Sequence, residues 1–146
     1  MFRINFMVAV AAWVFAPLSP ALAQDTHSSI RETVQNYLDG TRHGNPDLVD
    51  SVFADSLEVQ WLGEGDVLRR RVAADYIDMF RDGKFRDRKS RIVMIDATDR
   101  GATVKVEIEW NDRLYTDYML LLRIEGKWQI MNKIAVWEEA SSSAED

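Results

Sequence analysis

Residues 115–133, YTDYMLLLRIEGKWQIMNK, are the most informative part of the sequence. Apolar and aromatic residues lie on both sides of Glu125-Gly126, and this pattern predicts two long strands joined by a tight turn. Asp117 lies in the first strand among apolar neighbours. Because burying a bare carboxylate is too costly, this group must be paired, protonated or facing a cavity. We therefore expect Asp117 to mark a pocket.

Helical patterns come first in the chain. Ser29 with Glu32 forms a capping box, which predicts that a first helix begins at Ser29 and ends near Gly44. Asn45 followed by Pro46 predicts the start of a short second helix. A third helical pattern covers residues 72–80.

Strand patterns fill the rest. Residues 57–61 and 67–70 predict a first pair of strands, and residues 91–98 a third strand. Residues 102–110 alternate strictly between apolar and polar side chains, which is typical of a half-exposed strand. Helices followed by antiparallel strands indicate an α+β fold. We expect a cone-shaped, curved antiparallel sheet packed on three N-terminal helices, with a pocket between them.

Residues 1–23 match the pattern of a secretory signal peptide. Arg3 gives a positive start, residues 6–18 are apolar, and residues 21–23 (ALA) form a small-x-small cleavage site. The alternative is a retained anchor, but the apolar run is shorter than the roughly 20 residues that a spanning helix needs. We expect cleavage after Ala23, a periplasmic or secreted protein, and no membrane contact afterwards.

The remaining chain is long enough for one domain, which we place at residues 24–137. Residues 138–146 (EEASSSAED) predict a disordered polar tail. The formal net charge of −6 argues against binding to nucleic acid, and the absence of cysteine excludes thiol chemistry. Residues 81–91 (RDGKFRDRKSR) are strongly charged; we interpret them as a solvated loop rather than a basic docking patch.

Two segments together resemble the nuclear transport factor 2-like superfamily. They are residues 34–61, VQNYLDGTRHGNPDLVDSVFADSLEVQW, and the hairpin at residues 115–133, which resembles the putative lumazine-binding proteins of that superfamily. The resemblance covers residues 30–137. It implies a curved sheet around a cavity, a cystatin-like arrangement, and a homodimer formed through the sheet. It does not fix an activity, because this fold carries isomerases, dehydratases, cyclases and binding proteins.

Ketosteroid isomerase, an enzyme of this superfamily, gives a chemical comparison: it uses a carboxylate base on the first strand and an oxyanion hole formed by a helical tyrosine and a protonated aspartate on a late strand. Tyr37 matches the helical tyrosine of that enzyme, and Asp117 falls near its late-strand acid. The position expected for the base is Trp61, which cannot take a proton. The catalytic constellation is therefore incomplete, and whether the chain is an enzyme stays open.

Asp117 has three interpretations from the residues alone. It lines the pocket, it pairs with Lys133 or an arginine of the charged loop, or it lies at a solvated strand end. A two-residue turn places Asp117 opposite Ile134 and beside Asn132, whereas a loop one residue longer brings Lys133 to the same face.

Aromatic residues at strand and helix spacing form either core contacts or a box around a flat ligand. Tyr37 likewise is either a core tyrosine with a tied hydroxyl or an acid. No histidine pair has metal-ligand spacing, so we expect no metal and no cofactor. The candidate pocket residues are Tyr37, Trp61, Tyr76, Trp110, Tyr115, Asp117, Asn132 and Lys133.

Three functions are compatible with this pattern. The first is an exported domain that binds a small apolar or aromatic molecule. The second is a cofactor-independent isomerase, dehydratase or cyclase-like enzyme that uses the same pocket. The third is a structural dimerisation domain whose cavity is filled by its own side chains.

Overall fold

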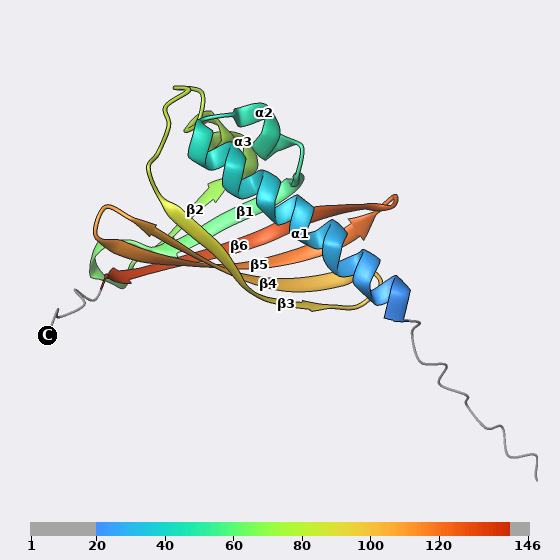
Figure 1. Cartoon of the computed structure of the whole chain (residues 1–146). Coiled ribbons are helices and arrows are strands. Elements are labelled where there is room, and N and C mark those ends of the chain that lie inside the picture. Colours follow the sequence, from blue (N-terminus) through green and yellow to red (C-terminus); the bar gives the residue numbers. More distant parts are fainter. Residues whose placement is uncertain (1–19, 141–146) are drawn as a thin grey trace, which may run out of the picture.

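A computed structural model describes residues 20–140 of the chain. Its six strands form one sheet in the order β2-β1-β6-β5-β4-β3, and α1 lies across one face (Figure 1). This arrangement confirms the expected α+β fold with a curved sheet. The elements are α1 (Pro20–His43), α2 (Pro46–Asp50), β1 (Phe53–Leu62), the 3-10 helix η1 (Glu64–Asp66), β2 (Leu68–Val72), α3 (Ala73–Asp78), β3 (Lys89–Ala97), β4 (Gly101–Trp110), β5 (Arg113–Ile124) and β6 (Lys127–Glu139).

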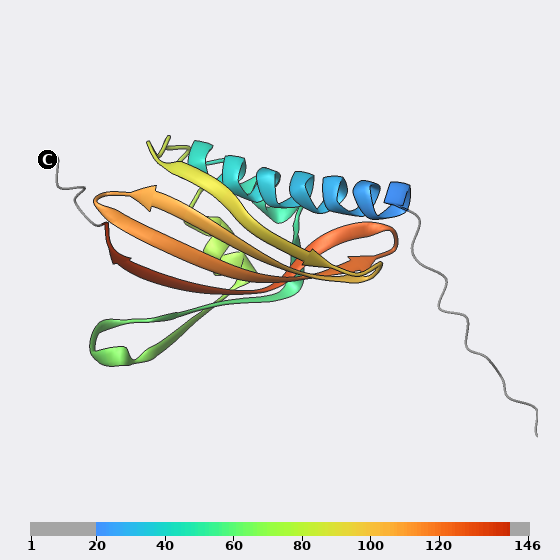
Figure 2. The same ribbon diagram turned by 60° about the horizontal axis from the view of Figure 1, so that its bottom comes forward.

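The sheet curves around α1, which runs along its inner face (Figure 2). Strands β3 to β6 are joined by antiparallel pairing, and β2 pairs antiparallel with β1. The pairing of β1 with β6 is parallel, so the expectation of a wholly antiparallel sheet is wrong at this junction. A parallel pair needs a long crossover, and the chain from β2 through β5 supplies it.

α1 is longer than the capping box predicts. The helix begins at Pro20, so Ser29 lies inside it, and the Ser29 hydroxyl donates to the carbonyl of Asp25 one turn earlier. The expected start at Ser29 is therefore wrong. Asn45 does cap α2, because its side chain accepts from the backbone N–H of Leu48.

The ends of the chain bear on the expected domain limits. β6 continues through Glu139, so the ordered domain extends beyond Trp137. Trp137 itself is 47 % exposed and lies against Arg113 rather than in the core. Most of the expected signal peptide, residues 1–19, and residues 141–146 of the expected tail lie outside the described residues. No helix in the described part combines the length and apolar character that a membrane span requires.

The β5–β6 hairpin turns at Glu125-Gly126, as predicted, and both residues have positive φ. Its register then changes by one residue. Leu121 pairs with Ile130, whereas Leu120 pairs with Asn132, so Met131 has no partner of its own. Such a bulge bends a strand and shifts which side chains face inward beyond it.

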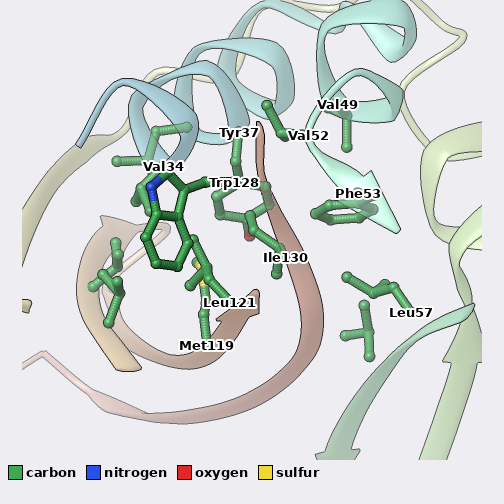
Figure 3. Packing of buried hydrophobic residues seen from close by; sticks show 14 of the residues in the cluster. Val34, Tyr37, Val49, Val52, Phe53, Leu57, Met119, Leu121, Trp128 and Ile130 are labelled. Carbon is green, nitrogen blue, oxygen red and sulfur yellow. The ribbon is translucent and has the colours of Figure 1, made fainter. Parts of the chain in front are cut away.

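The hydrophobic core lies between α1 and the inner face of β1, β4, β5 and β6 (Figure 3). α1 contributes Val34 and Tyr37, both almost fully buried, and the Tyr37 ring stacks on Phe53 with 5.7 Å between centroids. The alternating residues of β4 face inward, as the sequence predicts. The sheet side of the core contains Leu57, Val104, Val106, Met119, Leu121, Trp128 and Ile130.

Candidate functional site: a cavity with a buried ion pair

A cavity of about 230 Å³ lies between the inner face of the sheet, α1 and α3. Six aromatic side chains line it, together with one carboxylate and four cationic side chains. α2 supplies none of the lining residues, although we expected all three helices to border the pocket. The lining residues are Tyr37, Val59, Trp61, Arg71, Tyr76, Met79, Phe80, Arg86, Arg88, Ile108, Trp110, Tyr115, Asp117, Lys133 and Ala135.

Four polar side chains form a hydrogen-bonded network on the wall of this cavity. Asp117 Oδ2 accepts from the Tyr37 hydroxyl at 2.8 Å and from Lys133 Nζ at 3.1 Å. Lys133 Nζ also donates to Tyr37 at 2.9 Å and to Tyr76 at 3.2 Å. The two tyrosine hydroxyls are 3.1 Å apart. A buried pair of charges is tolerated only when further hydrogen bonds satisfy both partners, and this network supplies them.

The bulge in β6 creates this network. In a regular hairpin with the observed turn, Asp117 would pair with Ile134, and Lys133 would point to the outer face. The extra residue at Met131 moves the register, so that Asp117 pairs with Ala135 and Lys133 pairs with Met119. Lys133 then shares the inner face with Asp117. The predicted turn is right, and of the two registers that the sequence left open, the structure has Lys133 on the face of Asp117, through a bulge in β6 rather than a longer loop.

The network shifts the pKa of two of its members. Burial alone would lower the pKa of Lys133, but the Asp117 carboxylate and the Tyr76 hydroxyl outweigh it, so the pKa lies above the ordinary value of 10.5. Burial raises the pKa of Tyr37 well above 10.0, and the charge of Asp117 adds to this, while Arg88 opposes it. Lys133 is therefore a cation at neutral pH, and Tyr37 keeps its proton and donates it.

This geometry limits what the site can do as an acid or base. The comparison with ketosteroid isomerase asks for a protonated Asp117 that donates a hydrogen bond. In the structure the carboxylate instead accepts from two donors and forms an ion pair with Lys133. Trp61, the residue at the position expected for a base, lines the cavity, and Asp117 is the only carboxylate among the lining residues described. The site therefore holds no unpaired carboxylate base.

Seven of the eight candidate residues line the cavity, and Asn132 does not. Asn132 pairs with Leu120 and Glu58, whose side chains lie on the outer face, because the bulge precedes it. Two interpretations of Asp117 hold together: it lines the cavity and it pairs with Lys133. The Tyr37 hydroxyl is tied to neighbours, as expected for a core tyrosine, while the ring borders the cavity.

Sequence reasoning missed the arginines of the site. Arg71 lines the cavity from β2, and Arg86 and Arg88 reach it from the loop before β3. We expected that loop to be solvated, which is wrong for Arg88, because this side chain is only 9 % exposed. Arg71 pairs with Val59, an inward residue of β1, and therefore shares its face, a register that the structure supplies.

Arg88 is held by the last turns of α1. One terminal nitrogen, Nη2, donates to the carbonyl of Leu38 at 3.1 Å and to the hydroxyl of Thr41. The Nε atom is buried without a hydrogen-bond partner. Within the described part of the chain, no group of three or more metal-ligating side chains is placed to hold a metal ion.

Comparison with known proteins gives one family match and structural matches that share its fold. Residues 25–136 match the family described as putative lumazine-binding. The fold is similar to a nuclear transport factor 2-like protein of unknown function from Silicibacter pomeroyi DSS-3, with a TM-score of 0.72, 19% identity, and coverage of 80% of this chain and 98% of that one. It is also similar to a putative scytalone dehydratase from Novosphingobium aromaticivorans DSM 12444, with a TM-score of 0.62, 13% identity, and coverage of 88% and 96%.

A curated relative matches part of the chain. Aldolase FrzH from Cladobotryum sp is 37% identical over 62 residues, which are 41% of this chain and 48% of that protein. The chain thus spans about half the length of this relative. The two structural matches, both under 25% identical, support the fold alone.

Proposed function

Because the chain belongs to the putative lumazine-binding family of nuclear transport factor 2-like proteins, we propose that it binds a small aromatic molecule in its cavity, without catalysis. The fold of this family fits a ligand-binding domain. The observation that carries the proposal is an aromatic-lined cavity with a fixed polar wall, the usual composition of small-molecule sites.

The size of the cavity supports a small ligand. An engineered protein cavity of about 150 Å³ holds one benzene ring. A cavity of about 230 Å³ is larger, so it accommodates a ring with a substituent. Trp61, Trp110 and Tyr115 offer flat faces for stacking, and the rings of Trp110 and Tyr115 are 6.3 Å apart. This space also argues against a purely structural role in which side chains fill the interior.

The alternative is an enzyme that uses the same cavity, and one structural neighbour is described as a dehydratase. The geometry favours binding, because a general base must be free to take a proton within hydrogen-bond reach. Asp117 is occupied by Tyr37 and Lys133 instead. Turnover of a cyclic ketone or alcohol that disappears in Tyr37→Phe would favour the enzyme.

The binding proposal is tested by blocking the cavity from β6. Ala135→Phe adds a ring inside the cavity, whereas Ile134→Phe adds it at a neighbouring residue that is 46 % exposed on the outer face. Native mass spectrometry of protein equilibrated with extract of its own host should show a small-molecule adduct on the wild type and on Ile134→Phe. The adduct should be missing from Ala135→Phe.

A second measurement uses added compounds, so it does not depend on a ligand that stays bound during purification. A thermal-shift screen with one-ring and two-ring aromatic compounds should raise the Tm of the wild type and not of Ala135→Phe, because ligand binding to the folded state stabilises it. An unchanged Tm throughout, with no adduct, would overturn the proposal.

We also propose that the protein is exported. The support is the pattern of residues 1–23, which a signal peptidase would remove after Ala23. Intact mass of the protein secreted or released from the periplasm should match a chain that begins at Gln24, and Ala23→Arg should block the cleavage. Cytoplasmic protein with an intact N-terminus would contradict export.

We propose further that two copies associate through the outer face of the sheet. Five apolar side chains of β5 and β6 are 41–54 % exposed there, and Tyr118 pairs directly with Ile134. Lys105 and Glu107 of β4 form an ion pair at 3.5 Å beside this patch, which gives the patch a polar rim. The patch consists of Tyr118, Leu120, Leu122, Ile134 and Val136.

A further inference from the structure

The charges that line the cavity do not balance. Four cationic side chains face one carboxylate. Lys133 is paired with Asp117 at 3.1 Å, and Arg86 is paired with Asp82 at 3.3 Å. Arg71 and Arg88 remain, and neither has a carboxylate within 4.0 Å among the described residues. The cavity therefore carries an excess of positive charge in a chain whose net charge is −6.

Of these two residues, Arg88 has the greater need for a counter-charge, because it is the more buried. A guanidinium that is about nine-tenths buried loses most of its hydration, and such a charge is costly unless an anion faces it. The α1 carbonyl of Leu38 and the hydroxyl of Thr41 accept hydrogen bonds from Nη2, but they carry only partial charges. Nε is buried and unpartnered. Nη2 is thus held by the helix, while the guanidinium as a whole has no carboxylate partner among the described residues.

Arg71 adds a second unpaired positive charge to the cavity. Its guanidinium lies over the Trp61 ring, 5.2 Å from the centroid, and Nη1 contacts the sulfur of Met79. An aromatic face and a thioether are weak partners for a full charge. The stacking does hold the arginine against the cavity wall, so less side-chain freedom is lost when an anion arrives.

We propose that the ligand is an aromatic carboxylate whose anionic group pairs with Arg88 while its ring packs against the tryptophans of the cavity. This inference rests on the proposed binding function and specifies its ligand class. Arginine binds carboxylate through charge-assisted hydrogen bonds, which are stronger than neutral ones. Arg71 supplies a second positive charge that attracts the anion.

The test compares matched ligands on the wild-type protein. Isothermal titration with benzoate and benzamide, and with 1-naphthoate and 1-naphthamide, isolates the charge while the ring stays the same. Each carboxylate should bind about tenfold or more tightly than its amide at low salt, as expected for a hydrogen bond between charged groups. Added salt should reduce the preference, because it screens the field of the arginines.

Variants then show which residues cause the preference for the carboxylate over the amide. Arg88→Met should abolish the preference for the carboxylate, and Arg71→Met should reduce it. Arg70→Met is the matched control, since Arg70 is exposed on the same strand as Arg71 and does not line the cavity. If Arg88→Met fails to fold because α1 loses its contacts, Arg71→Met and the wild-type ligand pairs decide the matter.

The outcomes separate this inference from the binding function itself. Amides that bind as tightly as the carboxylates would overturn the anionic ligand and leave the aromatic binding site standing. A carboxylate preference that persists unchanged in Arg88→Met and Arg71→Met would place the anion elsewhere and overturn the inference as well. Failure of every ring compound to bind would overturn both.

Discussion

Lys133 is 3 % exposed. An ammonium group can be buried this deeply only if hydrogen bonds and an opposite charge replace its lost hydration. Asp117 provides the opposite charge, and the hydroxyls of Tyr37 and Tyr76 accept its other protons. The four side chains hydrogen-bond to one another on the cavity wall. Removal of one member leaves the others buried and unsatisfied, which makes the network sensitive to single substitutions.

Replacing one charge of the pair should be costly. Asp117→Asn leaves Lys133 buried without a counter-charge, and we expect the free energy of unfolding to fall by about 3–5 kcal/mol. Urea denaturation followed by tryptophan fluorescence measures this. Asp96→Asn, an exposed acid of β3, is the control and should change stability by no more than about 0.5 kcal/mol.

Replacing both charges should cost less than the sum of the single changes. In Asp117→Asn with Lys133→Met no uncompensated charge remains, so we expect a favourable coupling of about 0.5–3 kcal/mol in the double-mutant cycle. Purely additive effects would show that the two groups do not interact across their 3.1 Å contact.

The raised pKa values of Lys133 and Tyr37 predict how stability depends on pH. Both groups bind their protons more tightly in the folded chain than in the unfolded chain, whose values are near 10.5 and 10.0. Their contribution is complete below those values and is lost as the pH rises toward the folded pKa values, so stability should fall above about pH 10. Urea denaturation between neutral pH and about pH 12 measures the slope, and Lys133→Met should make it shallower. An identical slope in that variant would contradict the assignment.

At the scale of elements, two junctions position the site. The β6 bulge at Met131 turns Lys133 inward. Gly44, which follows the last residue of α1, packs against the loop before β3, which carries Arg88. Gly44 has a φ of +63°, and a Cβ there would lie 2.6 Å from the carbonyl carbon of Gly83. Gly126, in the hairpin turn, has a φ of +83° and open space around it.

These two glycines give a matched pair of substitutions. Gly126→Ala should cost about 1–2 kcal/mol, the strain of a left-handed residue alone. Gly44→Ala carries the same strain and a clash with backbone, so it should cost clearly more and also disturb Arg88. Thermal unfolding by circular dichroism compares them. Equal losses would mean that the contact between Gly44 and Gly83 is looser in solution.

At the scale of the whole molecule, charge and apolar surface are segregated. The inner cavity gathers arginines in an acidic chain, and the outer face of β5 and β6 exposes apolar side chains. A contiguous exposed apolar patch in a monomer usually marks an interaction site. The patch lies on β5 and β6, the two central strands of the sheet.

The association predicts a specific response to one added charge. Leu120→Lys places an ammonium in the middle of the patch, and sedimentation velocity should show a dimer becoming a monomer. Leu62→Lys is the control, because Leu62 is 49 % exposed on β1, outside the patch, against 54 % for Leu120. A wild-type protein that sediments as a monomer at high concentration would contradict the dimer.

Much of this molecule was predictable from local patterns. The alternation of β4, the Glu125-Gly126 turn, the Asn45 cap and the family resemblance led to the α+β fold and to seven of the lining residues. Each of these signals lies within a few neighbouring residues, where period and turn chemistry act directly. The length of α1 was missed because a capping box inside a longer helix looks the same as one at its start.

The sequence by itself determined that Asp117, in a strand rich in apolar and aromatic residues, must be paired, protonated or facing a cavity. Only the tertiary structure decided that the partner is Lys133, because one bulged residue sets the register of β6 and no local pattern marks it. The burial of Arg88 was likewise decided by the tertiary structure. Its loop contains several arginines among other charged residues, and which arginine turns inward depends on where α1 ends, far away along the chain.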